Sequence, residues 1–386
     1  MVWHDALVEI QALDELRARL HARLPLEGVR LQDLDLRPVE AELLARRDLG
    51  GLVVLGGRVP PDLAAHLLAQ GAVVFPGEPG APVDVFRAHL YTGHELYAGL
   101  DGPDGYAGTP DARAYRWTRD TRASRDAYAT LLRAIHDDSI SDALGEWVGG
   151  RRVVGVMGGH RAARGTPAYA ASAHLGFALA GRGLLVATGG GPGAMEAANL
   201  GAAAPSAAHL DAALAQLARV PSHHPDFGAW ARAGFEVLAE FGLRVSPREG
   251  APGPSPEPGA LLTHARSLGI PTWFYGHEPP NVFAEGIAKY FSNAIREDGL
   301  LARSNAGLVV LPGAAGTVQE VFQLATRLYY APVGSVLPPL VLVGRRHWTQ
   351  TLPVAALLEA LGRGRPMAQV VHLVDTVEEA VALVAS

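Results

Sequence analysis

The chain has 386 residues, of which 48% are hydrophobic and 19% charged, enough apolar material for at least two domains with buried cores. Its net charge of −6 argues against nonspecific binding to nucleic acid, so local loops would have to hold any anionic ligand. The absence of cysteine excludes disulfides, thiolate metal ligands and a cysteine nucleophile. Because the sequence carries neither a signal peptide nor an apolar run of membrane-spanning length, we expect no membrane contact and a cytoplasmic location.

Helices and strands alternate over the first 75 residues, which indicates a small α/β unit. The expected helices cover residues 1–25, 37–46 and 60–70, and the expected strands cover residues 26–34, 51–55 and 72–75. Nothing in this unit is typical of catalysis, so we assign residues 1–110 to an accessory N-terminal domain. Loop signals dominate residues 98–125, and residues 111–150 are expected to form a linker with a connecting helix over 122–144.

A second α/β domain is expected over residues 151–386, with an insertion at about 202–260. Its predicted strands are 153–157, 184–187, 272–275, 308–311, 339–343 and 370–373. Its predicted helices are 169–180, 194–201, 261–268, 282–301, 316–330, 349–361 and 376–384, with two more, 210–220 and 230–241, in the insertion. This order predicts a doubly wound parallel sheet with helices on both faces.

Glycine-rich turns follow three of the predicted strands, at Gly158–Gly159, Gly189–Gly193 and Gly313–Gly316. In a doubly wound sheet such turns converge at the carboxyl edge, where ligands bind. A glycine turn that opens a helix directs free backbone N–H groups at one point, and phosphate is the usual ligand there. The spacing Gly189-Gly190-Gly191-Pro192-Gly193 departs from the dinucleotide fingerprint, so we expect a mononucleotide. The alternative for each turn taken alone is a tight packing turn without a ligand.

A glutamate stands in the first turn of two of these helices, Glu196 after the second glycine turn and Glu320 after the third. Either carboxylate is a candidate for chemistry on the ligand. Thr317 and Glu320 also have the spacing of a capping box, in which both side chains only satisfy the first N–H groups of the helix. From the residues alone the two interpretations of Glu320 stay open.

The predicted helix 282–301 carries Glu285, Lys289, Ser292 and Arg296 on one polar face. Arg296 is a candidate contact to phosphate or ribose, and the alternative is an ion pair on the helix surface. Lys289, the only lysine of the chain, is expected to pair with Glu285.

Four histidines lie in predicted loops. His160 and His277 follow strands and are candidates for ligand contacts, although a structural role is as good an account of each. His223 and His224 lie in the insertion without a further metal ligand at suitable spacing, so we expect no metal site.

Taken together, the motif Pro312-Gly313-x-x-Gly316-Thr317-x-x-Glu320 and the upstream Gly189–Glu196 resemble the two glycine loops of the LOG family, often mislabelled lysine decarboxylases. The run from Tyr290 to Leu301 is similar to the larger bacterial branch of that family, the nucleotide 5′-monophosphate nucleosidases. The resemblance covers about residues 150–345, and Ala314 stands where the family motif has its second glycine.

This resemblance implies a Rossmann-like domain that hydrolyses the N-glycosidic bond of a nucleoside 5′-monophosphate such as AMP, giving free base and ribose 5-phosphate without a cofactor or metal. Gly313, Gly316 and Thr317 would hold the phosphate, and Glu320 would be catalytic with Arg296. The remaining expected substrate-binding residues are those of the other glycine turns, namely Gly158, Gly159, Gly189, Gly190, Gly191, Gly193 and Glu196. The resemblance also implies a homo-oligomer, a dimer or larger.

Two alternatives remain at this stage. The same fold can carry a nucleotide or cofactor without hydrolysing it. Decarboxylation with pyridoxal phosphate would require Lys289 as the residue that forms the Schiff base.

Overall fold

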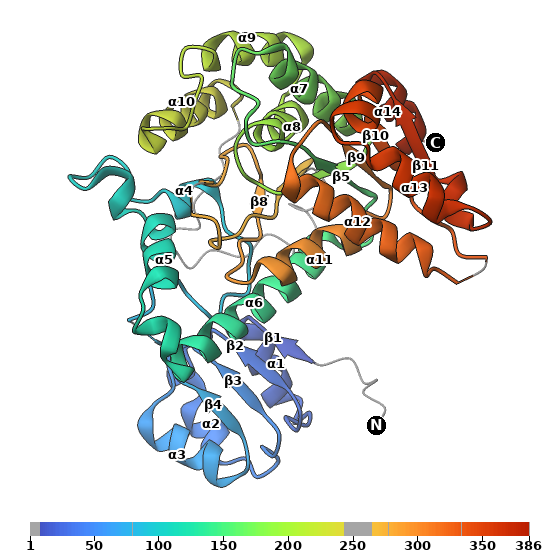
Figure 1. Ribbon diagram of the computed structural model, residues 1–386. Coiled ribbons are helices and arrows are strands. Elements are labelled where there is room, and N and C mark those ends of the chain that lie inside the picture. Colours follow the sequence, from blue (N-terminus) through green and yellow to red (C-terminus); the bar gives the residue numbers. More distant parts are fainter. Residues whose placement is uncertain (1–7, 79, 243–264, 277, 333, 386) are drawn as a thin grey trace. The chain divides into compact units, whose positions relative to one another are not determined.

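The computed structural model describes residues 8–78, 80–242, 265–276, 278–332 and 334–385 (Figure 1). They divide into two compact units, one of residues 1–89 and 120–143 and the other of residues 90–119 and 144–386. The segment 90–119 therefore belongs with the larger unit, whereas the sequence had placed a domain boundary at residue 110.

The smaller unit is α/β, as the sequence predicted. Its described residues form a sheet of four parallel strands in the order β1-β2-β3-β4. The strands are β1 (Glu9–Ile10), β2 (Arg30–Gln32), β3 (Val53–Leu55) and β4 (Val73–Phe75), and the helices between them are α1 (Leu13–His21), α2 (Glu40–Leu44) and α3 (Pro61–Ala69). Leucines from both helices and strands, among them Leu16, Leu31 and Leu63, fill its core. Part of the long helix predicted over residues 1–25 is instead the strand β1, and residues 1–7 lie outside the described range.

Seven parallel strands make up the sheet of the larger unit, counted over its described residues, in the order β11-β10-β9-β5-β6-β7-β8. They are β5 (Val153–Met157), β6 (Leu185–Thr188), β7 (Ser267–Gly269), β8 (Gly286–Ile287), β9 (Gly307–Val310), β10 (Leu340–Val343) and β11 (Val371–Val374). The helices are α4 (Gly93–Leu96), α5 (Pro110–Arg119), α7 (Pro167–Ala180), α8 (Ala194–Ala203), α9 (Ala207–Leu217), α10 (Phe227–Glu240), α11 (Asn293–Arg303), α12 (Ala315–Tyr329), α13 (Val354–Gly362) and α14 (Val377–Val384). Helix α6 (Ala127–Val148) begins in the smaller unit and ends in the larger one.

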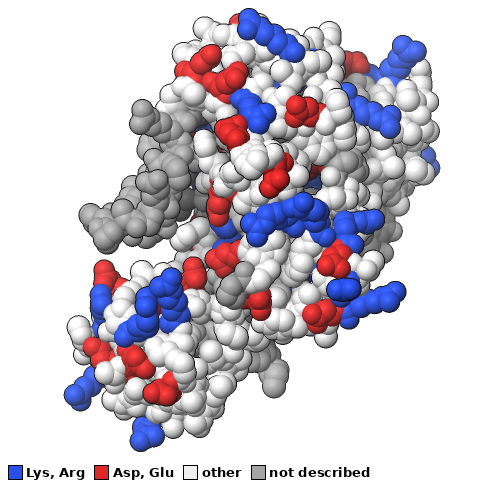
Figure 2. Space-filling view, turned by 90° about the vertical axis from the view of Figure 1, so that its left-hand side faces the viewer, with Lys and Arg blue, Asp and Glu red and all other residues white. Residues whose placement is uncertain are grey.

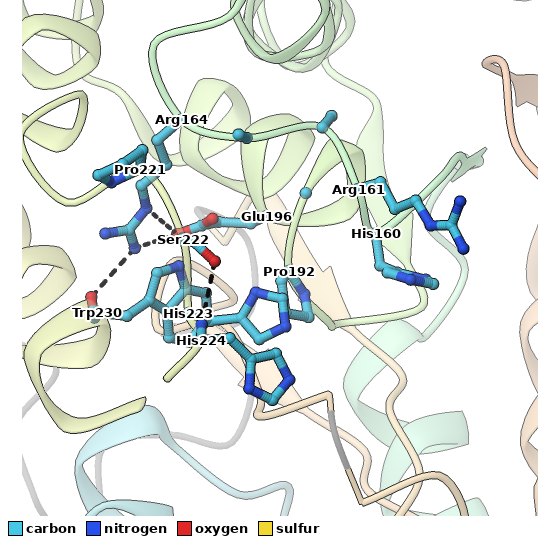
Figure 3. Close-up of a pocket in the computed structure, with 13 residues that line it drawn as sticks. His160, Arg161, Arg164, Pro192, Glu196, Pro221, Ser222, His223, His224 and Trp230 are labelled. Atoms are coloured by element: carbon cyan, nitrogen blue, oxygen red, sulfur yellow. Dashed lines mark hydrogen bonds and ion pairs between the residues drawn. The ribbon is translucent and has the colours of Figure 1, made fainter. Parts of the chain in front are cut away.

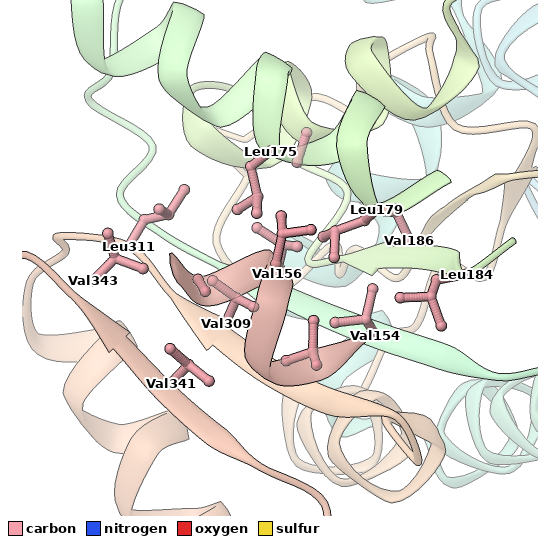
Figure 4. Packing of buried hydrophobic residues seen from close by; sticks show 14 of the residues in the cluster. Val154, Val156, Leu175, Leu179, Leu184, Val186, Val309, Leu311, Val341 and Val343 are labelled. Carbon is pink, nitrogen blue, oxygen red and sulfur yellow. The ribbon is translucent and has the colours of Figure 1, made fainter. Parts of the chain in front are cut away.

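Helices cover both faces of this sheet, which confirms the predicted doubly wound α/β fold (Figure 1). On one face, valines of the central strands pack against α7 and its neighbours, as Val154, Val156 and Val309 do around Leu175 and Leu179 (Figure 4). Such strands are apolar on both sides, which is why they appear in the sequence as short continuous runs and not as alternating patterns.

The prediction of one helix over residues 282–301 is correct only for its second half. Residues 286–287 are strand β8, the chain continues without regular structure, and the helix α11 begins only at Asn293. Residues 281–291 are buried at every position except Glu285. A segment that is buried on all sides has no polar face, so the helical spacing of its apolar residues does not indicate a helix.

Three other predictions needed correction. Residues 272–275 are not a strand. The strand β7 lies at 267–269 and overlaps the end of the helix predicted for 261–268, of which residues 261–264 are outside the described range. The region 98–125 contains the ten-residue helix α5. Pro353 separates a short π-helical turn, His347–Thr351, from α13, where one continuous helix was expected.

Candidate functional site

Strands β5 and β9 are neighbours at the centre of the larger sheet, and the chain leaves them in opposite directions. From β5 the order runs outward through β6, β7 and β8, and from β9 it runs the other way through β10 and β11. This is the topological switch point, the place where open α/β sheets bind ligands beyond the carboxyl ends of their strands. The loops after β5 and β9 touch there, since the N–H of Gly159 donates to the carbonyl of Pro312 at 3.2 Å.

The turn after β5 is packed tightly against its neighbours. A Cβ on Gly158 would lie 2.7 Å from the Cβ of Ala194, and one on Gly159 would lie 3.4 Å from the carbonyl oxygen of Pro312. The carbonyl of Gly159 accepts a hydrogen bond from the N–H of Ala194 at the start of α8. These two glycines therefore allow the loops after β5, β6 and β9 to pack together. This is the packing role that was the alternative to ligand binding for such turns.

The turn after β6 connects the switch point to a buried arginine. Gly193 has φ +76°, and a side chain there would collide with the backbone of His160. At the other end of the turn, a Cβ on Gly189 would clash with the guanidinium of Arg296, whose Nη2 donates to the Gly189 carbonyl at 3.4 Å. Asn281 fixes the middle of the turn, because its N–H donates to Gly190 and its Nδ2 to Gly191.

The turn after β9 leads into α12, and here the structure removes the capping-box interpretation. Helix α12 begins at Ala315 with Ala314 as its N-cap residue, so Thr317 and Glu320 both lie inside the helix. Thr317 packs its side chain where a Cβ on Gly313 would stand, and a Cβ on Gly316 would meet no atom within 4 Å. The exposed first turn of α12 carries N–H groups that have no acceptor within the helix, as an anion site requires.

Glu320 faces Arg296 from the neighbouring helix. Arg296 Nη1 lies 2.9 Å from Glu320 Oε1, and Arg296 Nε donates to the carbonyl of Ile270 at 2.8 Å. The two residues are 6% and 8% exposed, so this is a buried ion pair and not the surface pair considered for Arg296. With Gly189, the pair brings together one residue from the turn after β6, one from α11 and one from α12.

The pKa of Glu320 is raised above its usual value. Burial of the carboxyl is the largest cause, and the nearby charges of Glu297 and Glu278 add to it, whereas the Arg296 guanidinium opposes it. Glu297 itself accepts hydrogen bonds from Asn293 and Gln319, each at 2.7 Å, and so ties α11 to α12. A buried carboxylate with a perturbed pKa at the carboxyl edge of the sheet makes Glu320 a candidate functional residue.

Glu196 belongs to a different cluster. It forms a buried ion pair with Arg164, whose Nε lies 3.0 Å from Glu196 Oε1 and whose guanidinium lies 4.9 Å from the ring centre of Trp230 (Figure 3). These residues help to line a pocket of about 300 Å³ beside Pro192 and Gly193, whose lining also includes His223 and His224. Glu196 thus lines a cavity near the glycine turn but is held by Arg164.

The prediction for Lys289 was wrong. Lys289 is 2% exposed, and its Nζ donates to Asp111 of α5 at 2.6 Å. Asp111 also accepts a hydrogen bond from Trp273 Nε1 at 2.8 Å, so the pair is part of a buried network. Glu285, the expected partner, instead accepts from the backbone N–H groups of residues 266 and 267. This environment does not favour a Schiff-base lysine, because the amine is enclosed and already paired.

Among the strand-end histidines, His160 lies with its Nδ1 3.2 Å from Glu278 Oε1, and His277 is outside the described residues. No sequence pattern indicates this contact, or the partners of Glu196 and Lys289, because each contact joins segments that are distant along the chain. Within the described part of the chain, no group of three or more His, Asp or Glu side chains is arranged to hold a metal ion.

Figure 2 shows acidic and basic side chains interspersed over one face of the molecule. None of the described helices combines the length and apolar character needed to cross a membrane.

The fold and the site define a Rossmann-like α/β protein with a buried arginine–glutamate pair at the switch point of its sheet. Comparison with protein-family models gives no match, and no curated protein matches the chain.

Proposed function

We propose that this protein hydrolyses the N-glycosidic bond of nucleoside 5′-monophosphates, releasing the free base and ribose 5-phosphate. The observation that carries the proposal is the buried pair of Arg296 and Glu320 beside two glycine turns at the carboxyl edge of the sheet. The resemblance of those turns to the loops of the LOG family supports the same reaction.

The 5′-phosphate is assigned to the exposed start of α12. The first turn of a helix offers N–H donors and the positive end of the helix dipole, and Gly316 leaves open space in front of them. Thr317 lies in the same turn and can add a hydroxyl donor. Fixing a remote phosphate supplies binding energy that positions the reacting sugar.

Glu320 is assigned to the sugar. Breaking the bond between ribose and base passes through an oxocarbenium-like state, with positive charge at the anomeric carbon. A carboxylate close to that carbon stabilises the charge and accepts a proton from the attacking water. The water oxygen forms the new bond to the anomeric carbon, and the electron pair of the broken bond leaves with the base.

Arg296 keeps Glu320 in the form that this chemistry needs. Burial and neighbouring carboxylates favour the protonated acid, and the guanidinium at 2.9 Å favours the carboxylate and fixes its orientation. Arg296 is itself fixed by the Ile270 carbonyl. The guanidinium therefore opposes the rise in the Glu320 pKa that burial causes.

The test is a panel of nucleoside monophosphates, assayed for release of free base and of ribose 5-phosphate in equal amounts. Release from AMP supports the proposal. Tight binding of AMP without release of base identifies a nucleotide carrier on the same fold, and neither binding nor release from any member of the panel refutes both assignments.

A further inference from the structure

His160 stands at the point where three strand-end loops meet. It follows Gly159 at the end of β5, and its backbone is pressed against Gly193 of the turn after β6. Its side chain is 39% exposed and lies on the wall of the pocket beside Pro192 (Figure 3). An imidazole in this position is held by the scaffold and is open to a ligand.

Glu278 lies in the segment that follows β7. It contacts this imidazole and influences Glu320 electrostatically. Its Oε1 lies 3.2 Å from His160 Nδ1, and its Oε2 would lie 3.5 Å from a Cβ on Gly191. The charge of Glu278 is also close enough to Glu320 to contribute to the raised pKa of that residue. The one carboxylate of Glu278 therefore acts on both His160 and Glu320. His160 contacts Gly193 at one end of the turn after β6, and the Arg296 partner of Glu320 contacts Gly189 at the other end.

The proposed reaction leaves one chemical requirement unmet. A purine is a poor leaving group as an anion, so a proton must reach the base as the glycosidic bond breaks. Arg296 holds its protons too tightly to donate one, and Glu320 is required as a carboxylate. A second acid is needed on the base side of the sugar.

We propose that His160 is this general acid, and that Glu278 is the positioning residue that orients its imidazole, an inference that rests on the proposed nucleosidase function. The imidazolium transfers one proton to a ring nitrogen of the base while the electron pair of the glycosidic bond moves onto the base. Water adds to the anomeric carbon and loses its proton to Glu320. Return of a proton from solvent to His160 and release of one from Glu320 restore the starting state, so the balance is that of hydrolysis.

The charges around His160 suit this role. Its hydrogen bond to Glu278 raises the pKa of the imidazole, whereas partial burial and the guanidinium of Arg161 oppose the rise. The same pocket is lined by the Glu196–Arg164 ion pair and by the rings of His223 and His224. The pocket they line, about 300 Å³, falls at the lower end of the range for small-molecule sites and offers room for a departing base next to the acid.

A purely structural role makes different predictions from general acid catalysis. If His160 and Glu278 only tie two loops together, substitution lowers stability and leaves the pH dependence of turnover intact. If His160 delivers the proton, AMP turnover falls on the alkaline side as the imidazolium is lost, and that alkaline limb belongs to His160.

The experiment compares the full-length wild type with His160→Gln and Glu278→Gln, and with His209→Gln as a matched control on an exposed surface of α9. Thermal melts establish folding, and kcat/KM for AMP is measured from pH 5 to 10. We expect His160→Gln to lose roughly 100-fold or more and to lack the alkaline limb. Glu278→Gln should keep the limb but shift it to lower pH, and His209→Gln should match the wild type.

The role of Glu278 can also be tested without measuring turnover, by NMR titration of the His160 imidazole. The C–H signals of His160, assigned by their absence in His160→Gln, should titrate at a higher pH in the wild type than in Glu278→Gln. A folded His160→Gln variant that retains the alkaline limb, whatever its rate, overturns the inference, as does an unchanged titration of His160 in Glu278→Gln. A wild type that releases no base from any nucleotide instead refutes the proposed function, and the two failures are thereby distinguished.

Discussion

Replacing Glu320 by glutamine separates catalysis from a structural role at the centre of the site. The amide has nearly the same shape and can still accept the hydrogen bond from Arg296, but it carries no charge. Because an amide cannot balance a developing oxocarbenium ion, we expect AMP hydrolysis to fall by roughly 100-fold or more, the scale seen when one electrostatic stabiliser is removed.

The effect of Glu320→Gln on the free energy of unfolding depends on its buried ion pair with Arg296. Deleting one partner of a buried pair outright costs about 3–5 kcal/mol, because the other charge is left without compensation. In Glu320→Gln, Arg296 keeps acceptors in the amide oxygen and in the carbonyls of Ile270 and Gly189. Burial already disfavours the ionised Glu320, so its neutral replacement also removes a desolvation cost. We therefore expect a loss of about 1–2 kcal/mol in the free energy of unfolding.

A matched control is available elsewhere in the chain. Glu379 forms a true capping box with Thr376 at the start of α14, so Glu379→Gln tests what the same substitution does to a helix cap alone. The assays are a thermal melt, a titration with AMP and a base-release measurement on one preparation of each variant. We expect Glu320→Gln to bind AMP and not hydrolyse it, and Glu379→Gln to hydrolyse it normally. Hydrolysis by Glu320→Gln at a rate near that of the wild type would refute the reasoning.

Two further predictions concern pH and assembly. Glu320 must be ionised to act, and its pKa in the folded protein is raised above the usual 4.5 of glutamate. As the pH is lowered, kcat/KM for AMP should therefore begin to fall while the pH is still above 4.5. An acidic limb with its midpoint at or below that value would contradict the assignment. The resemblance to the LOG family implies at least a homodimer formed through helices of the larger unit, so light scattering at micromolar concentration should give twice the mass of the 40.6 kDa chain or more, and a monomer would contradict this expectation.

The fold could be predicted from the sequence where a helix has one apolar side, or where a short apolar run closed by glycines marks a buried strand. The alternation of strands and helices gave the doubly wound architecture, and the three glycine turns were correctly placed at strand ends. The prediction failed over residues 282–291, where burial on all sides leaves no period to distinguish a helix from extended chain. The error then propagated, since the expected pairing of Lys289 with Glu285 assumed that helix.

The candidate site was predictable only in its local parts. Arg296 and Glu320 were both named as candidates, but their contact depends on how α11 packs against α12, which spacing along the chain does not specify. The capping-box interpretation of Glu320 failed because α12 begins at Ala315, two residues before Thr317. His160 and Glu278 are more than a hundred positions apart in the sequence, and no local sequence pattern predicts a contact between such residues.

The most direct test of the account compares AMP with adenosine as substrates of the wild-type protein. If the start of α12 holds the 5′-phosphate and the Arg296–Glu320 pair acts on the sugar, AMP should yield adenine and ribose 5-phosphate in equal amounts, and adenosine should react far more slowly. Equal turnover of the two substrates would contradict the phosphate site, and failure to release adenine from AMP would contradict the assignment of Glu320 to glycosidic cleavage of that nucleotide.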